Sequence, residues 1–95
     1  MPDLTEQQKR QKAEDLIHEL NPDALFMDGF DDAIIGIGQK FTDDPVVVYD
    51  EDDIFKVLFK WGMNYEEAQE YFSFNIKGSW VGPNTPIIVQ PLCCL

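Results

Sequence analysis

The sequence is poor in basic residues. Seven lysines and arginines stand against eighteen aspartates and glutamates, which gives a formal net charge of −11. Free nucleic acid and anionic membrane surfaces are polyanions that such a chain repels, so we expect neither as a partner. The natural complement is a basic protein surface. Acidity that only keeps the protein soluble would give the same composition, and that interpretation stays open.

Cysteine, histidine and long apolar runs are scarce as well. The two cysteines, Cys93 and Cys94, are adjacent, where a disulfide between them is strained. This usage fits a reducing compartment. The first ten residues are polar, and no apolar run reaches the roughly 20 residues that span a membrane. We therefore expect a cytoplasmic protein without a signal peptide or membrane anchor.

What the sequence does contain is apolar residues at helical spacing, which predicts about four short helices. The expected helices cover residues 5–20, 31–40 and 50–61, with a fourth that begins at Asn64. The side chains expected to face inward are Ala13, Leu16, Ile17 and Leu20; Phe30, Ala33, Ile34, Ile37 and Phe41; Ile54, Val57, Leu58 and Trp61; and Tyr65, Ala68, Phe72 and Ile76. Among these we expect Ile34, Trp61 and Phe72 to be core residues.

The third and fourth expected helices carry recognisable ends. Asp50 is an N-cap and Gly62 is a C′ residue for the third helix. Asn64 and Glu67 form a capping box for the fourth. Phe55 and Phe59 widen the apolar face of the third helix, which indicates that it is either central to the fold or covered by a partner.

Two segments read as strands. Residues 46–49 are β-branched and aromatic, and residues 85–90 are rich in β-branched side chains and end at Pro91. Strands so far apart must pair non-locally. We expect one α+β domain over residues 1–95, in which about four helices pack on a small sheet that pairs 46–49 with 85–90. Residues 1–23 form an extra N-terminal helix, and residues 91–95 form a tail.

No pattern of catalytic residues is present. His18 is the only histidine, and neither Ser73 nor Ser79 lies in a nucleophile elbow. No twelve-residue window satisfies the calcium-loop pattern, and one histidine with two adjacent cysteines does not supply zinc ligands at the usual spacings. We expect no catalytic residue, no cofactor and no metal, and therefore not an enzyme.

The composition favours binding instead. Residues 28–53 contain nine carboxylates and one lysine, Lys40, and the fourth helix adds three glutamates on its outer face. Capping explains the carboxylates of residues 50–53 locally. The candidate partner-binding residues are Asp28, Asp31, Asp32, Asp43, Asp44, Glu66, Glu67 and Glu70. Carboxylates spread over a rigid fold can imitate duplex phosphates and occupy a basic groove, and we expect the cluster of Asp31, Asp32, Asp43 and Asp44 to dominate.

The chain also resembles a known group of proteins. The segments that carry the likeness are DGFDDAIIG at 28–36, VYD at 48–50, GM at 62–63, EEA at 66–68, YFxFN at 71–75 and GxWVGxxTP at 78–86. They resemble a family of small acidic proteins that tailed bacteriophages and prophages encode widely and that carry no assigned activity. The likeness covers about residues 24–89. It implies a phage accessory protein made in the cytoplasm of the infected bacterium, and it carries over no catalytic or binding residue.

Three functional hypotheses follow. The first is an acidic inhibitor, of the anti-CRISPR type or similar, that mimics DNA and blocks a basic nucleic-acid-handling host or defence protein. The second is a phage structural or assembly accessory whose acidity serves solubility. The third is a small enzyme or nucleotide-sequestering protein that uses the glycine-rich segments and Trp80. A homodimer is compatible with all three.

Overall fold

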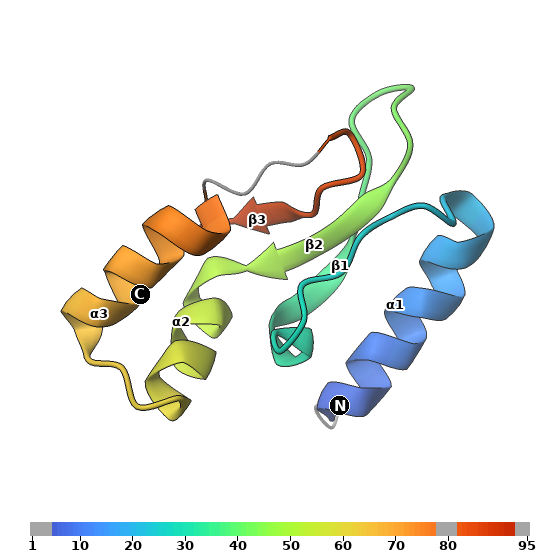
Figure 1. Ribbon diagram of the computed structural model, residues 1–95. Helices are drawn as coiled ribbons and strands as arrows, with labels where there is room; N and C mark the ends of the chain where they lie inside the picture. Colours follow the sequence, from blue (N-terminus) through green and yellow to red (C-terminus); the bar gives the residue numbers. More distant parts are fainter. Residues whose placement is uncertain (1–4, 78–81, 93–95) are drawn as a thin grey trace.

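The computed structural model describes residues 5–77 and 82–92. The expected tail with Cys93 and Cys94 lies outside the described residues, as does Trp80. In chain order the elements are α1 (Glu6–Leu20), the 3₁₀ turn η1 (Asp31–Ala33), β1 (Ile34–Gly38), β2 (Val46–Asp50), α2 (Glu51–Lys60), α3 (Tyr65–Tyr71), the π-helical segment η2 (Phe72–Lys77) and β3 (Ile87–Val89) (Figure 1). The α+β class is confirmed.

A three-stranded mixed sheet lies at the centre, in the order β1-β2-β3. β1 and β2 form an antiparallel hairpin, whereas β2 and β3 run parallel, with Val48 opposite Ile87 and Asp50 opposite Val89. Parallel neighbours need a long crossover, and α2, α3 and η2 supply it (Figure 1). The expected pairing of residues 46–49 with residues 85–90 is confirmed.

The helix expected over residues 31–40 is wrong. Only Asp31–Ala33 are helical, and Ile34–Gly38 are a strand paired with β2. The apolar residues there fit both the helical spacing and the alternation of a strand. The glycines disfavour a helix and the isoleucines favour a strand, once the valine-rich β2 lies beside them. Gly38 lies so close to β2 that a Cβ would come within 2.8 Å of Val48 Cγ2. The described residues thus contain three α-helices, where four helices were expected.

The core lies where the helices meet the sheet. Val47 and Tyr49 of β2 are fully buried and contact the apolar side of α1, which contributes Ala13 and Ile17. From the crossover, the core takes Ile54, Val57 and Leu58 of α2, together with Ala68, Phe72 and Ile76. Ile34 and Phe72 are buried as expected.

Five residues expected inside are exposed: Leu16, Leu20, Phe41, Trp61 and Tyr65. Trp61 is 49% exposed because α2 ends at Lys60 and Trp61 is its C-cap. α1 meets only a narrow sheet, so its buried stripe is reduced to two residues. The caps are confirmed: Asp50 accepts from Asp53 N, Asn64 and Glu67 form the capping box, and Gly62 has φ +96°. No helix among the described residues is long and apolar enough to cross a membrane.

Candidate functional site: carboxylates and an exposed aromatic surface

The candidate carboxylates fall into three separate groups. Asp28, Asp31 and Asp32 lie in or beside η1, the second group is in the 41–44 turn of the hairpin, and the third is on α3. Four residue steps of β1 separate the first group from the hairpin turn by about 14 Å. The four acids expected to form one cluster, Asp31, Asp32, Asp43 and Asp44, are therefore divided between opposite ends of the hairpin.

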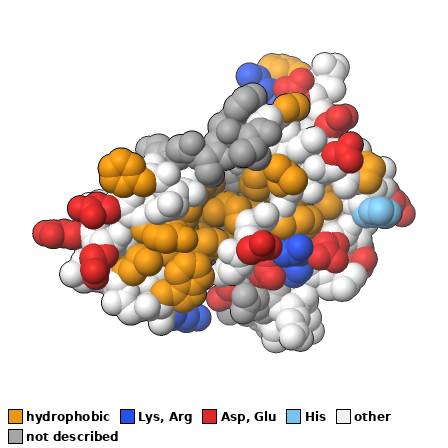
Figure 2. All heavy atoms as spheres, viewed as in Figure 1, with side chains coloured by type: hydrophobic (Ala, Val, Ile, Leu, Met, Phe, Trp, Pro, Cys, Tyr) orange, Lys and Arg blue, Asp and Glu red, His pale blue; other side chains and the backbone are white. Residues whose placement is uncertain are grey.

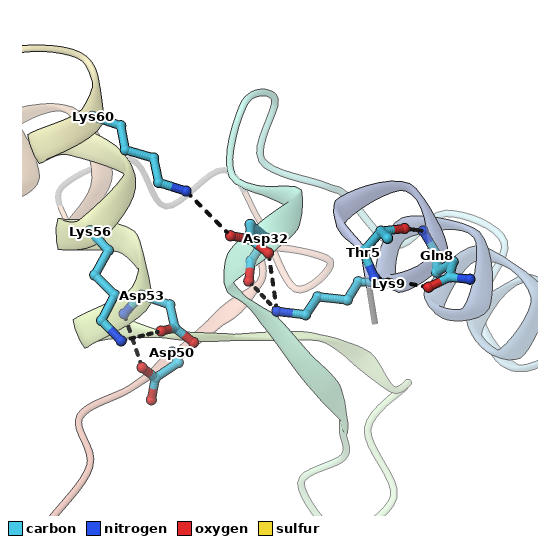
Figure 3. Close-up of polar contacts among 8 residues, drawn as sticks. All are labelled: Thr5, Gln8, Lys9, Asp32, Asp50, Asp53, Lys56 and Lys60. Atoms are coloured by element: carbon cyan, nitrogen blue, oxygen red, sulfur yellow. Dashed lines mark hydrogen bonds and ion pairs between the residues drawn. The ribbon is translucent and has the colours of Figure 1, made fainter. Parts of the chain in front are cut away.

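The η1 carboxylates hold α1 in place (Figure 3). Lys9 Nζ donates to the backbone oxygen of Asp32 at 2.6 Å and to its Oδ1 at 3.2 Å. Lys60 Nζ of α2 reaches the other carboxylate oxygen of Asp32 at 3.9 Å. Arg10, which follows Lys9 on α1, donates from Nη1 to Asp31 Oδ1 at 3.0 Å. Asp31 and Asp32 therefore already have basic partners from two helices.

Arg10 is bound on three sides. Besides Asp31, its Nε donates to Glu14 Oε1 at 2.6 Å, and its guanidinium lies 4.0 Å from the centroid of the Phe26 ring. Burial alone would lower the pKa of Arg10, but the hydrogen bonds with Asp31 and Glu14 reverse the effect and raise it. We call this set of Arg10, Glu14, Phe26 and Asp31 the Arg10 clamp.

Tyr49 lies on the same side of the sheet as the clamp. Its side chain is fully buried, and its hydroxyl accepts a hydrogen bond from Met27 N at 2.8 Å. Burial raises the pKa of Tyr49 to about 12, against a smaller lowering by the Met27 hydrogen bond. The Tyr49 hydroxyl has a structural role, because its hydrogen bond from Met27 N fixes the segment between α1 and η1.

The α3 carboxylates are placed differently. Glu66, Glu67 and Glu70 are all exposed, and none of the ion pairs found within residues 5–77 and 82–92 includes them. Glu67 accepts from Asn64 N at 3.0 Å as part of the capping box, which leaves its second oxygen free to accept. Figure 2 shows acidic side chains along the α3 side of the molecule, next to hydrophobic ones.

The hairpin turn carries the remaining pair. Asp43 and Asp44 are exposed, and Asp43 N donates to Lys40 O at 2.9 Å. Phe41, in the same turn, is 90% exposed and has φ +50°, which is uncommon for a bulky side chain. This group thus lies at a tip of the molecule, apart from the other two.

Sequence reasoning missed an aromatic surface on the α2–α3 side, in which Trp61 and Phe74 are exposed and Tyr71, with the neighbouring Met63, is partly buried. The Trp61 ring centroid lies 5.1 Å from that of buried Phe30 and 6.1 Å from that of Tyr71. Gly29, at φ +88°, passes so close to the indole that a Cβ would be 3.1 Å from it. The available signal was the broad apolar face of the third expected helix, which Gly62 interrupts directly after Trp61.

The aromatic surface and the α3 carboxylates share one hollow. It is shallow and open to solvent, has a volume of about 340 Å³, and is lined by Met63, Glu67, Glu70, Tyr71, Phe74 and Asn75. Apolar rings and carboxylates thus face the same space. An apolar or cationic side chain of a partner fits that lining, whereas an anionic one does not.

Metal binding and catalysis each require a particular arrangement of ionisable side chains. Within the described residues, no group of three or more His, Cys, Asp and Glu side chains is placed to hold a metal ion. His18 is exposed on α1 and lines a shallow hollow with Glu14, Asp15 and Glu19. No serine or cysteine lines that hollow.

No protein-family model, no curated protein and no solved structure matches the chain. What defines the candidate site is its own chemistry: a hollow of rings and carboxylates on an acidic α+β domain. Exposed aromatic anchors surrounded by a polar rim are typical of protein-recognition surfaces, whereas carboxylates are less common at their centres.

Proposed function

We propose that this chain is a binding protein that occupies a basic, nucleic-acid-handling surface of another protein. The observation that carries the proposal is the unequal use of its carboxylates. Lys9 and Arg10 of α1 and Lys56 and Lys60 of α2 pair with Asp31, Asp32, Glu14 and Asp53, while the α3 glutamates are exposed outside these pairs. Asp43 and Asp44 are also exposed and outside these pairs. We favour the α3 group for recognition because Glu67 and Glu70 share a hollow with Tyr71 and Phe74.

The spacing of these carboxylates supports mimicry of a phosphate backbone. Glu66 and Glu70 are four residues apart on α3, which is a rise of about 6 Å along the helix. Successive phosphates of one strand in duplex DNA rise about 3.4 Å along the axis, and the winding of the strand increases their separation in space to a length comparable with that rise along α3. A basic groove that contacts successive phosphates can contact two such carboxylates with little rearrangement.

The resemblance to phage-encoded proteins indicates which basic protein to look for. A protein made during infection meets host transcription and replication factors and defence nucleases, all of which have basic nucleic-acid-binding surfaces. An inhibitor of the anti-CRISPR type is one instance. The cytoplasm of an infected bacterium is the compartment that this proposal requires.

The experiment starts from affinity capture in a bacterial lysate, with the captured protein identified, purified and assayed for nucleic-acid binding. We expect a basic protein whose nucleic-acid binding falls when this chain is added. We also expect affinity to weaken strongly from about 50 to 500 mM salt, because exposed charges are screened beyond the Debye length. An affinity unchanged over that range contradicts the proposal. Capture of virion proteins supports the assembly accessory instead, and a bound nucleotide supports the sequestering protein.

Charge reversals locate the contact. The variant Glu66→Lys/Glu70→Lys should lose the partner, and Asp43→Lys/Asp44→Lys, with the same change in net charge at the hairpin turn, should keep it. Glu67 is left intact because it caps α3. Retention of the partner by the α3 variant, with its helical circular-dichroism signal unchanged, would remove α3 from the contact.

A further inference from the structure

We propose that the hollow between Tyr71, Phe74 and the carboxylates of Glu67 and Glu70 is a binding site for an arginine side chain of the basic partner. The proposal rests on the proposed function and specifies which side chain the partner inserts. Its starting point is that the same chain already holds one arginine by the same groups.

That internal example is the Arg10 clamp. There one aromatic ring, Phe26, lies 4.0 Å from the guanidinium carbon, and two carboxylates accept its N–H groups at 2.6 and 3.0 Å. A guanidinium is planar, so it can stack on a ring while its edge donates to carboxylates. The hollow presents the same groups: the rings of Tyr71 and Phe74 beside two glutamates.

Among the described residues, no base pairs with the carboxylates of the hollow. Arg10 on Phe26 is the one cation–π contact found in the described part of the chain, and the ion pairs found there include neither Glu67 nor Glu70. Phe74 is 81% exposed. An incoming guanidinium can therefore contact the Phe74 ring and the two carboxylates after it displaces only water.

Two of the side chains that line the hollow are held in position. Tyr71 packs edge-on against Trp61, with an interplanar angle of 89°, and Trp61 rests on buried Phe30. Glu67 is oriented by its hydrogen bond from Asn64 N. Side chains that are already held lose less freedom when a partner binds, which favours affinity. Trp61, half exposed beside Tyr71, gives the partner an adjoining apolar contact.

The occupant is a different protein rather than a second copy of this chain. The sequence contains a single arginine, Arg10, and the clamp already engages it. Two copies with a net charge of −11 each also repel one another. A basic partner has both the missing guanidinium and the opposite charge, so complementarity selects it.

The test uses two peptides of equal length and charge, one of alternating arginine and glycine and one of alternating lysine and glycine. Isothermal titration calorimetry with the full chain should show the arginine peptide binding about five- to tenfold more tightly, because the guanidinium stacks and forms paired hydrogen bonds. The variants Phe74→Ala and Glu70→Gln should reduce this ratio to about one and leave the lysine peptide within about twofold.

Matched controls are available elsewhere on the chain. Phe59→Ala removes another exposed aromatic ring, and Asp43→Asn removes another exposed carboxylate; both should keep the preference for arginine. Equal affinity for the two peptides, or a preference that survives both Phe74→Ala and Glu70→Gln, would overturn the site. A captured partner that depends on salt and on Glu66 and Glu70 but tolerates Phe74→Ala refutes the arginine site alone. A partner indifferent to all of these changes refutes the proposed function as well. Self-association in sedimentation that Phe74→Ala abolishes would assign the surface to a second copy instead.

Discussion

The carboxylates of η1 and those of α3 have the same chemistry and opposite surroundings. Asp31 and Asp32 are partly buried and join α1 to the rest of the fold through Arg10 and Lys9. The α3 glutamates are exposed, and only Glu67 has a structural role, as a cap. The position of the bases makes the difference, because Lys9 and Arg10 both lie on the first turns of α1. An acidic residue therefore indicates recognition only where the fold brings no base to it.

The same contrast holds for aromatic side chains. Phe72 and Phe74 are two residues apart in η2, yet the first is buried and the second is exposed. Phe72 packs on Phe55 of α2 at a centroid distance of 5.1 Å, whereas Phe74 lines the hollow. One side of η2 therefore packs in the core through Phe72, and the other side leaves the ring of Phe74 exposed to solvent.

The largest effect is expected for Phe72. Phe72→Ala should lower the free energy of unfolding by about 3–5 kcal/mol, because it removes a large buried side chain and leaves a cavity. Phe74→Ala should change it by less than about 0.5 kcal/mol, as is usual at exposed positions. Urea unfolding followed by circular dichroism measures both. Equal losses for the two variants would show that η2 does not separate a buried side from a free one.

The second prediction concerns Tyr49 on the clamp side of the sheet. Its pKa is raised from 10.0 to about 12 by burial, so the folded state holds the proton where the unfolded state releases it. This contribution to stability is complete below pH 10 and is lost as the pH rises toward 12. The loss reaches up to about 2.7 kcal/mol, at 1.36 kcal/mol per pKa unit.

Tyr49→Phe isolates this effect from the titration of lysines. The variant loses the hydrogen bond to Met27 at every pH, so the comparison is between slopes of stability against pH from 9 to 12. The parent should fall more steeply than the variant. Parallel slopes would mean that Tyr49 titrates alike in the folded and unfolded chains.

The smallest effect compares one carboxylate from each region. Asp31→Asn should destabilise the protein by about 1–2 kcal/mol, because it weakens a partly buried, charge-assisted hydrogen bond to Arg10. Glu70→Gln, an equally conservative change on α3, should stay within about 0.5 kcal/mol of the parent. Thermal unfolding in low salt distinguishes the two. If Glu70→Gln is the more destabilising variant, α3 carboxylates serve the fold and their role in binding is in doubt.

Local patterns predicted most of the elements. The helices over residues 6–20, 51–60 and 65–71 follow from apolar spacing and from caps such as Asp50 and Asn64, which act within a few residues. β2 and β3 follow from short β-branched runs. Residues 34–38 were expected to be helical, because their apolar side chains fit the helical spacing as well as the alternation of a strand. Only the pairing with Val46–Val48 decides for the strand.

The candidate site divides in the same way. Its acidic character, its lack of catalytic patterns and the outward face of α3 could be read from the residues, because composition and helical spacing are properties of the chain itself. The core position expected for Trp61 was wrong, since nothing in the local pattern says that the fold beyond Gly62 leaves the indole half exposed.

The sequence by itself determined the negative charge, the caps and the apolar stripes, because each depends on residue type and on neighbours a few positions away. The tertiary structure decided which carboxylates meet a base and which rings meet solvent. Arg10 reaches Asp31 across 21 positions, and Lys9 reaches Asp32 across 23. Such long-range contacts form only when the hairpin places η1 against α1. Their distances depend on the whole fold, so no short window of sequence encodes them.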